Sequence, residues 1–303
     1  MRASDRTTVA GAAEVRGVTL FTGVSSRVTI RPGAPGTGIV FVRVDLPVHE
    51  PIPARAEFVV PESRRTVLAL PDRTSAGPIV LVQTVEHVLS ALAGLGVHDA
   101  IIEVDGPEVP IGDGSALPFV EAILAAGPVS VPCDSLSHLR QPIVVRERIE
   151  ITDPRGPQFG TIVAEPRGGG GAEEGLELTY HLDYGPNAPI APQTVTFVSI
   201  PGDGRYQGEI APARTFSTLD EAKAMRAMGL FTHLTAAQML VIGPDGPVEN
   251  QYRFPDEPAR HKVLDMLGDL SLGGAGRPIQ ARITAWRSGH ALNHAMALRL
   301  AGM

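Results

Sequence analysis

The segment from Pro258 to Leu270 constrains the fold more than any other stretch of the chain. Its proline suits the first turn of a helix, where a missing N–H costs nothing. In that helix His261, Asp265 and Asp269 follow one another at spacings of four residues, so they share one face. The opposite face is apolar and consists of Val263, Leu264, Leu267 and Leu270. The pattern predicts a helix that packs on one side and presents an imidazole and two carboxylates on the other.

Two interpretations of the polar face stay open from this segment alone. A histidine and an aspartate one helical turn apart can hold one metal ion. Polar residues on the outer face of an amphipathic helix are usually just solvated, and short motifs have a real false-positive rate. The rest of the chain must decide between a metal site and a solvated face.

Composition favours a globular protein that acts on small ligands. The chain has 303 residues, a mass of 31.9 kDa, 43% hydrophobic residues and a mean hydropathy of +0.08. These values allow a full core and predict two compact domains. The 26 basic and 33 acidic residues give a formal charge of −7, and no run rich in Lys and Arg occurs. We therefore expect no nucleic-acid partner.

Cysteine usage and the first residues indicate the compartment. Cys133 is the single cysteine, which excludes an internal disulfide framework and a cysteine-based zinc site. Residues 1–17 carry several charges and no apolar core segment, so no secretory signal is visible, and no stretch predicts an integral membrane segment. We expect a cytoplasmic monomer.

Strand and helix patterns alternate in two similar series. In the first half, short strands between residues 16 and 44 precede a helix from Gln83 to Gly94, which Thr84 can cap. A strand at Ala100 to Val104 and a helix at residues 119–126 follow. The second half, from residue 143, again has strands and helices, then a strand at residues 279–286 and a terminal helix.

This order predicts an α+β fold made of two copies of one module. We place the N-terminal domain at residues 1–135 and the C-terminal domain at residues 136–303, with a proline-bounded linker at 131–142. Residues 167–175, which include four consecutive glycines, are expected to form a hairpin tip. No sequence identity between the halves is evident, so the repeat is an architectural inference.

A second candidate pair, Glu86 and His87, lies near the start of the first-half helix. There the helix dipole disfavours a charged imidazolium, so His87 would be neutral and able to bind a metal ion. Together with His261 and Asp265 it would supply two nitrogens and one oxygen and leave a fourth position for water, the pattern of catalytic zinc. Glu86 could then take a proton from that water. Such a donor set also suits Fe²⁺.

Both an ordinary structural role and a functional role are open for four further residues, His290, Thr215, Phe216 and Lys262. His290 follows a strand, in a predicted turn, and could protonate a leaving nitrogen, with Asp269 orienting it. Thr215 and Phe216 precede a helix, so they are either a cap and a core ring or substrate contacts. Lys262 could meet a phosphate or a polarised carbonyl, although a solvated lysine is the simpler account.

The sequence resembles UDP-3-O-acyl-N-acetylglucosamine deacetylases, the zinc amidases of lipid A biosynthesis. The matching blocks run in the family's order and comprise Thr84-Val85-Glu86-His87, Ala91-Leu92-Ala93-Gly94-Leu95-Gly96, Pro110-Ile111-Gly112-Asp113-Gly114-Ser115-Ala116, Ala213-Arg214-Thr215-Phe216, Arg260-His261-Lys262-Val263-Leu264-Asp265, Gly268-Asp269-Leu270 and Ser288-Gly289-His290-Ala291-Leu292-Asn293. They cover nearly the whole chain, and jointly they are highly specific.

The resemblance implies two similar α+β domains whose helices pack between two sheets, with a Zn²⁺ site at their junction. It implies a role for each candidate: His87, His261 and Asp265 as zinc ligands, Glu86 as general base, His290 as the cationic partner supported by Asp269, Thr215 on the carbonyl oxygen, and Phe216 with Lys262 on the nucleotide sugar. The implied substrate is a UDP-linked acylated amino sugar.

Two segments depart from the family's pattern. Phe21 follows Leu20 where the family usually has a histidine, so it cannot offer the same polar contact. Around Leu230 to Thr235, a stretch that includes the changed segment Thr232 to Thr235, other residues replace the family's Gly-Gly-Ser beside the acyl-chain passage. Bulk at this place should narrow or redirect that passage. The substrate could therefore have a shorter acyl group. Two alternatives to the implied function also remain: a deacetylase for another N-acetyl amino sugar, and a non-catalytic relative that binds a sugar nucleotide.

Overall fold

The protein consists of two modules that repeat one strand order. The computed structural model describes residues 5–71, 80–133, 141–167, 175–236 and 238–303. The N-terminal sheet has five strands in the order β2 (Ala13–Val18), β3 (Ser25–Pro32), β9 (Ala100–Val104), β4 (Ile39–Arg43) and β5 (Pro51–Pro53). The C-terminal sheet has the order β12 (Ile149–Thr152), β13 (Thr161–Glu165), β19 (Ile279–Trp286), β14 (Leu176–Leu182) and β15 (Gln193–Ser199), and β11 (Ile143–Val144) extends it beside β19.

In both sheets the strand that comes last in the sequence lies in the centre. β9 runs parallel to β4 and antiparallel to β3, while β19 runs parallel to β14 and antiparallel to β13. A helix directly precedes and another follows each central strand: α1 (Glu86–Leu95) and α2 (Leu117–Ala126) around β9, and α5 (Glu257–Gly274) and α6 (His290–Ala301) around β19. The predicted duplication of one α+β module is therefore confirmed at the level of topology.

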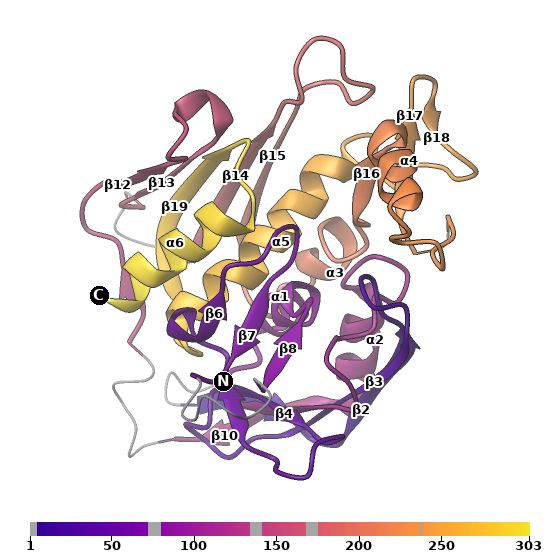
Figure 1. The fold of residues 1–303 in the computed structure, drawn as a ribbon. Helices are drawn as coiled ribbons and strands as arrows, with labels where there is room; N and C mark the ends of the chain where they lie inside the picture. The colour runs from indigo at the N-terminus through magenta and orange to yellow at the C-terminus, as the bar shows by residue number, and fades with distance from the viewer. Residues whose placement is uncertain (1–4, 72–79, 134–140, 168–174, 237) are drawn as a thin grey trace.

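The helices α1, α2, α5 and α6 form a layer between the two sheets (Figure 1). α5 crosses the middle of the molecule and packs against α1, α6, β14 and β15. On β19 the buried residues alternate with more exposed ones, because one sheet face is covered by helices and the other faces solvent. The apolar stripe of α5 lies in the core, where Val263, Leu264 and Leu270 have no exposed surface.

The polar face of α5 is buried as well. His261, Asp265 and Asp269 are only 2%, 3% and 0% exposed. The solvated-face interpretation of this helix is thus wrong, because α1 and α6 cover the side that an isolated amphipathic helix would turn to water. Gly268 allows the close approach of α1, since a Cβ atom there would lie 2.2 Å from the carbonyl oxygen of Glu86.

Smaller elements complete the two modules. One three-stranded sheet consists of β6 (Val59–Val60), β7 (Val67–Ala69) and β8 (Leu81–Gln83). A second consists of β16 (Phe216–Thr218), β17 (Leu240–Gly243) and β18 (Gly246–Pro247). A two-stranded sheet pairs β1 (Asp5–Val9) with β10 (Pro128–Pro132). The other helices of the described residues are α3 (Arg205–Glu209) and α4 (Leu219–Ala227), with short 3₁₀ turns at Ala56–Phe58 and Pro157–Phe159.

Several local predictions need correction. Thr84 does not cap α1: its backbone is left-handed, with φ of 58°, and its hydroxyl donates to Glu108 instead. His290 is the first residue of α6 and not part of a turn before it. The predicted linker begins inside β10, which pairs with β1 near the N-terminus. The predicted domain boundary at 135/136 and the four consecutive glycines of the predicted hairpin tip lie outside the described residues.

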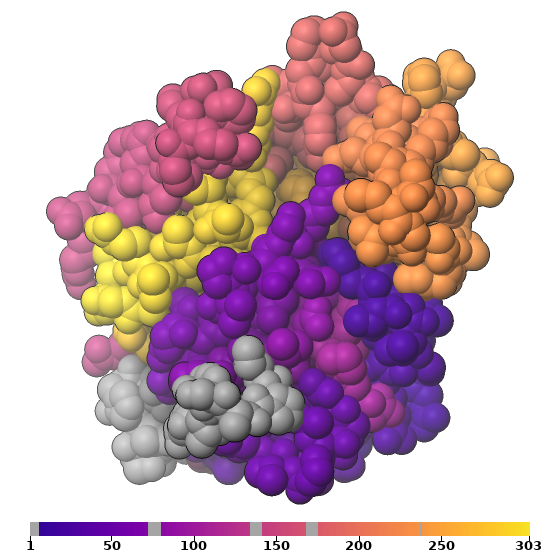
Figure 2. Space-filling view, viewed as in Figure 1, coloured from indigo at the N-terminus to yellow at the C-terminus, as the bar shows by residue number. Residues whose placement is uncertain are grey.

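The face shown in Figure 2 contains a recess between the segments that carry α4 and α6. Residues 62–64, just before β7, line the cavity at this place. Among the described helices, none combines the length and apolar character needed to cross a membrane.

Candidate functional site

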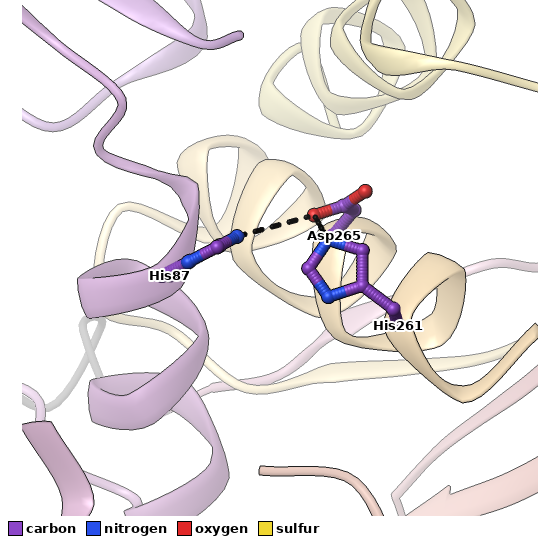
Figure 3. A group of neighbouring side chains, drawn as sticks. All are labelled: His87, His261 and Asp265. Atoms are coloured by element: carbon purple, nitrogen blue, oxygen red, sulfur yellow. Dashed lines mark ion pairs between the residues drawn. The ribbon is translucent and has the colours of Figure 1, made fainter. Parts of the chain in front are cut away.

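Three predicted metal ligands meet where α1 lies against α5. His87 projects from the first turn of α1, and His261 and Asp265 project from successive turns of α5 (Figure 3). The carboxylate oxygen Oδ1 of Asp265 lies 3.4 Å from Nε2 of His261 and 3.8 Å from Nε2 of His87. The two imidazole rings stand edge to face, with centroids 5.1 Å apart. One atom from each of the three residues lies within 4.8 Å of the others, close enough to share one ion.

The protonation of these side chains fits metal binding. Burial lowers the pKa of His261 to about 3 and also lowers the pKa of His87, so both rings are neutral near pH 7. Nδ1 of His261 donates to the carbonyl oxygen of Ala213 at 3.0 Å, because a carbonyl can only accept. This leaves a lone pair on Nε2, the nitrogen that faces Asp265. Two neutral imidazoles and a carboxylate are a chemically suitable donor set for a divalent cation.

Asp265 is held as a carboxylate. Burial alone would raise its pKa, but electrostatic interactions with His261 and Lys262 lower it below the usual range. Nζ of Lys262 donates to Oδ2 of Asp265 at 2.8 Å and lies 5.5 Å from the centroid of the Phe216 ring. Lys262 is thus an ion-pair partner of the candidate metal ligand in this structure and not a freely solvated side chain.

Glu86 adjoins the metal ligands and is almost completely buried. It is 3% exposed, and burial raises the pKa of its carboxyl to about 7. Oε2 accepts a hydrogen bond from the backbone N–H of Thr66 at 3.1 Å. A carboxylate with a pKa near neutrality can take a proton and release it again.

His290 and Asp269 form the second acid–base pair. Nδ1 of His290 donates to Oδ2 of Asp269 at 2.8 Å, and Nε2 of His290 lies 4.0 Å from Oδ2 of Asp265. Burial alone would lower the pKa of His290, but the Asp269 carboxylate outweighs burial and raises it to about 9. His290 is therefore cationic near pH 7, while Glu86 is close to its midpoint.

Most of the predicted site residues line one cavity of about 650 Å³. The predicted members are Glu86, His87, Thr215, Phe216, His261, Lys262, Asp265 and His290. Asp269 is not part of the lining, because it lies fully buried behind His290. Thr215 is fixed by its backbone, since its N–H donates to the carbonyl of Gly114 at 2.7 Å and its carbonyl accepts from the N–H of Leu240 at 2.9 Å.

The two segments that depart from the family's pattern meet at an apolar part of this cavity. The ring of Phe21 stands edge to face against Phe231, with centroids 5.2 Å apart. The guanidinium carbon of Arg65 lies 4.2 Å from the centroid of the Phe21 ring. Nε2 of His233 donates to the carbonyl of Thr19 at 2.9 Å, which fastens residues 231–234 to the N-terminal module. Phe21 and Phe231 both line the cavity and occupy space at this end of it.

Sequence reasoning missed two polar residues behind His290. Thr66, fully buried, lies 2.5 Å from Asp269 and 2.9 Å from Nε2 of His294 through its hydroxyl. His294 comes four residues after His290, and this helical spacing would have signalled it had α6 been predicted to begin at His290. Thr66 carries no such signal, since it comes from the segment before β7 in the other module.

The donor set, the carboxylate with a raised pKa and the cationic imidazole are those of a metal-dependent hydrolase. The model of the UDP-3-O-acyl N-acetylglycosamine deacetylase (LpxC) family matches residues 6–302. The chain belongs to this family.

Several deacetylases are similar to this chain over most of their own length. The UDP-3-O-acyl-N-acetylglucosamine deacetylase of Myxococcus xanthus is 35% identical over 299 residues, which cover 97% of this chain and 85% of that protein. The protein of the same name from Synechocystis is 38% identical over 289 residues, 95% of each chain. That of Phenylobacterium zucineum is 37% identical over 297 residues, 97% of this chain and 92% of the relative.

Proposed function

We propose that this protein hydrolyses the N-acetyl amide of UDP-3-O-acyl-N-acetylglucosamine, a step of lipid A biosynthesis. The observation that carries the proposal is the grouping of His87, His261 and Asp265 with Glu86 and His290 around one cavity, in a chain of this family. The deacetylase names of its relatives support the same reaction.

His87, His261 and Asp265 would hold the metal ion, which we propose to be Zn²⁺, with Fe²⁺ as the chemically similar alternative. When bound, the ion would act as a Lewis acid that lowers the pKa of a water molecule and polarises the amide carbonyl. Lys262 contributes to this site by lowering the pKa of Asp265, so that the ligand stays ionised.

The protein's own groups would supply the proton transfers. Glu86, as a carboxylate, accepts the proton of the attacking water. The hydroxyl of Thr215 donates a hydrogen bond to the carbonyl oxygen, where negative charge develops. His290, as an imidazolium, donates its Nε2 proton to the leaving nitrogen when the tetrahedral intermediate collapses. Asp269 keeps Nδ1 of His290 protonated and turns Nε2 toward the cavity.

Phe216 and Lys262 are proposed contacts of the nucleotide sugar. Both line the cavity next to His261. The ring of Phe216 offers an apolar face to a sugar, and the ammonium of Lys262 offers a positive charge to its polar groups.

We propose that the protein acts as a monomer in the cytoplasm and that residues 1–135 and 136–303 are its two domains. The free, buried thiol of Cys133 is compatible with a reducing compartment. The repeated strand order supports the division into two domains.

The test measures acetate release from UDP-3-O-acyl-N-acetylglucosamine together with zinc content by elemental analysis. We expect acetate release by the wild type and a loss of about 10²- to 10⁴-fold in kcat for Glu86→Ala, with zinc retained. Glu57→Ala, an exposed carboxylate in a 3₁₀ turn, is the matched control and should behave as the wild type.

Other outcomes would support the alternatives. Release of acetate only from a different N-acetyl amino sugar would identify a deacetylase with changed specificity. Bound zinc without acetate release from any N-acetyl sugar would indicate a binding relative. Absence of zinc after purification without chelators would contradict the metal site itself.

A further inference from the structure

A threonine hydroxyl lies at the centre of the polar cluster behind His290. Oγ1 of Thr66 is 2.5 Å from Oδ1 of Asp269, 2.9 Å from Nε2 of His294 and 3.3 Å from Nδ1 of His290. Thr66 has no exposed surface. Its backbone N–H donates to the Glu86 carboxylate, so this one residue touches both proposed proton-transfer systems.

The hydroxyl of Thr66 has one proton, and the surrounding groups determine where it points. Burial alone would raise the pKa of Asp269, but the neighbouring histidines lower it below its usual range, so Asp269 is a carboxylate that can only accept. The short contact with Oδ1 therefore requires the Thr66 proton. The 2.9 Å contact with His294 must then run the other way, with an N–H on Nε2 donating to the Thr66 oxygen.

His294 reaches this position because it lies one helical turn after His290 on α6. The two rings are nearly parallel, with centroids 6.1 Å apart and an angle of 29° between their planes. His290 faces Oδ2 of Asp269 at 2.8 Å, while His294 lies beside Oδ1 at 3.4 Å. Asn293 donates a further hydrogen bond to Oδ2 at 2.9 Å. Both carboxylate oxygens of Asp269 therefore have hydrogen-bond partners. Oδ1 accepts from Thr66, and Oδ2 accepts from His290 and Asn293.

We propose that Thr66 and His294 are positioning residues for His290 and act through Asp269. His294 donates to Thr66, Thr66 donates to Oδ1 of Asp269, and the carboxylate is fixed with Oδ2 toward Nδ1 of His290. This inference rests on the proposed function, because the position of His290 affects a rate only if His290 protonates the leaving nitrogen of the amide. It also links the modules, since Thr66 belongs to the N-terminal one and the other three residues to the C-terminal one.

The kinetic test compares variants that remove or keep each hydrogen bond. Thr66→Val removes the hydroxyl but keeps the shape and the backbone N–H, whereas Thr66→Ser keeps the hydroxyl. His294→Leu removes the donor, whereas His294→Gln keeps an N–H at a similar position. We expect Thr66→Val and His294→Leu to lower kcat about tenfold with KM unchanged within about twofold, and the conservative variants to restore most of the rate.

Combined variants show whether the two residues act through Asp269. In an Asp269→Asn background, Thr66→Val and His294→Leu should cause almost no further loss, and the Thr66→Val/His294→Leu double variant should lose about as much as either single one. Full additivity would overturn the inference. The partly exposed His294 can be tested even if changes at the buried Thr66 prevent folding.

A second readout does not need activity. In protein labelled with ¹⁵N-histidine, the His294 signal, assigned from its loss in His294→Gln, should show a proton on Nε2, and Thr66→Val should shift it. An unprotonated Nε2 would overturn the inference. If the wild type releases no acetate but Nε2 of His294 is protonated, the proposed function fails and the hydrogen-bond chain stands. If the wild type is active and Thr66→Val keeps its kcat, the inference alone fails.

Discussion

Nδ1 of His290 lies 2.8 Å from Oδ2 of Asp269, and this hydrogen bond sets the charge of the imidazole that faces the cavity. Burial by itself would leave His290 neutral near pH 7. The Asp269 carboxylate reverses that tendency, so that the proposed acid is charged while the proposed base, Glu86, is partly ionised.

We expect kcat/KM to rise as the pH passes through about 7 and to fall as it passes through about 9. Glu86 must lose its proton to act as a base, and its pKa is raised to about 7. His290 must keep its proton to act as an acid, and its pKa is raised to about 9. Acetate release measured from about pH 5 to pH 10.5 checks both limbs.

Asp269→Asn should move the alkaline limb to lower pH, because an amide no longer stabilises the imidazolium. The acidic limb, which reports Glu86, should move much less. An alkaline limb that stays in place in Asp269→Asn would contradict the assignment of that limb to His290.

Gly268→Ala should destabilise the protein by about 1 to 3 kcal/mol, because the added Cβ would press on the carbonyl of Glu86 and force α1 and α5 apart. Gly274→Ala, in the same helix, is the control, since its Cβ would meet only ordinary contacts with Ile279 at 3.8 Å. Urea unfolding monitored by circular dichroism measures both. Equal stability of the two variants would show that helix spacing does not depend on Gly268.

Removal of the metal should lower the melting temperature as well as the activity. The proposed ligands come from both modules, so a bound ion stabilises the folded chain by mass action, by about 2.7 kcal/mol at 100 times its Kd. Scanning calorimetry before and after chelation, and after addition of Zn²⁺ or Fe²⁺, measures the shift.

His261→Ala should abolish this metal-dependent shift in melting temperature. The control is His181→Ala, whose ring stacks on Trp286 at the C-terminal sheet. An unchanged shift in His261→Ala would contradict its role as a ligand.

Phe231→Ala should increase kcat/KM for substrates with longer acyl groups relative to shorter ones. The change removes the ring that packs against Phe21 at the apolar part of the cavity and so lengthens the available space. Competition between substrates of different acyl length, followed by mass spectrometry, gives the ratio. Leu230→Ala, a neighbouring exposed side chain, should leave the ratio unchanged.

The sequence predicted the modules and the groups that helical spacing brings together. His261 and Asp265 are one turn apart, so their proximity follows from local geometry. The meeting of both with His87 could not follow from spacing, because it depends on how α1 packs on α5. The residue types suggested the combination as a donor set, and the family resemblance implied the same three ligands. The polar face of α5 shows the limit of local patterns, since its burial is decided by neighbours distant in sequence.

Other features required the tertiary structure. Thr66 precedes β7, which pairs with β8, and β8 leads into α1. Because α1 packs on α5, this segment brings Thr66 to Asp269 of α5. Thr84 was expected to cap α1, but Glu108 binds its hydroxyl and a left-handed backbone is stabilised there instead. At Thr84 a partner distant in sequence overrides the local preference, and at Thr66 distant partners create a role that no local pattern indicates.

The repeated strand order has a consequence for the precision of the site. In each module the helix that bears proposed ligands directly precedes the central strand, so β9 fixes the position of α1 and β19 that of α5. A small rotation of one module against the other would change the distances from His87 to both His261 and Asp265 at once, while leaving the distance within α5 unaltered. The affinity for the ion should therefore respond to changes of the interface between the modules, including substitutions far from any ligand.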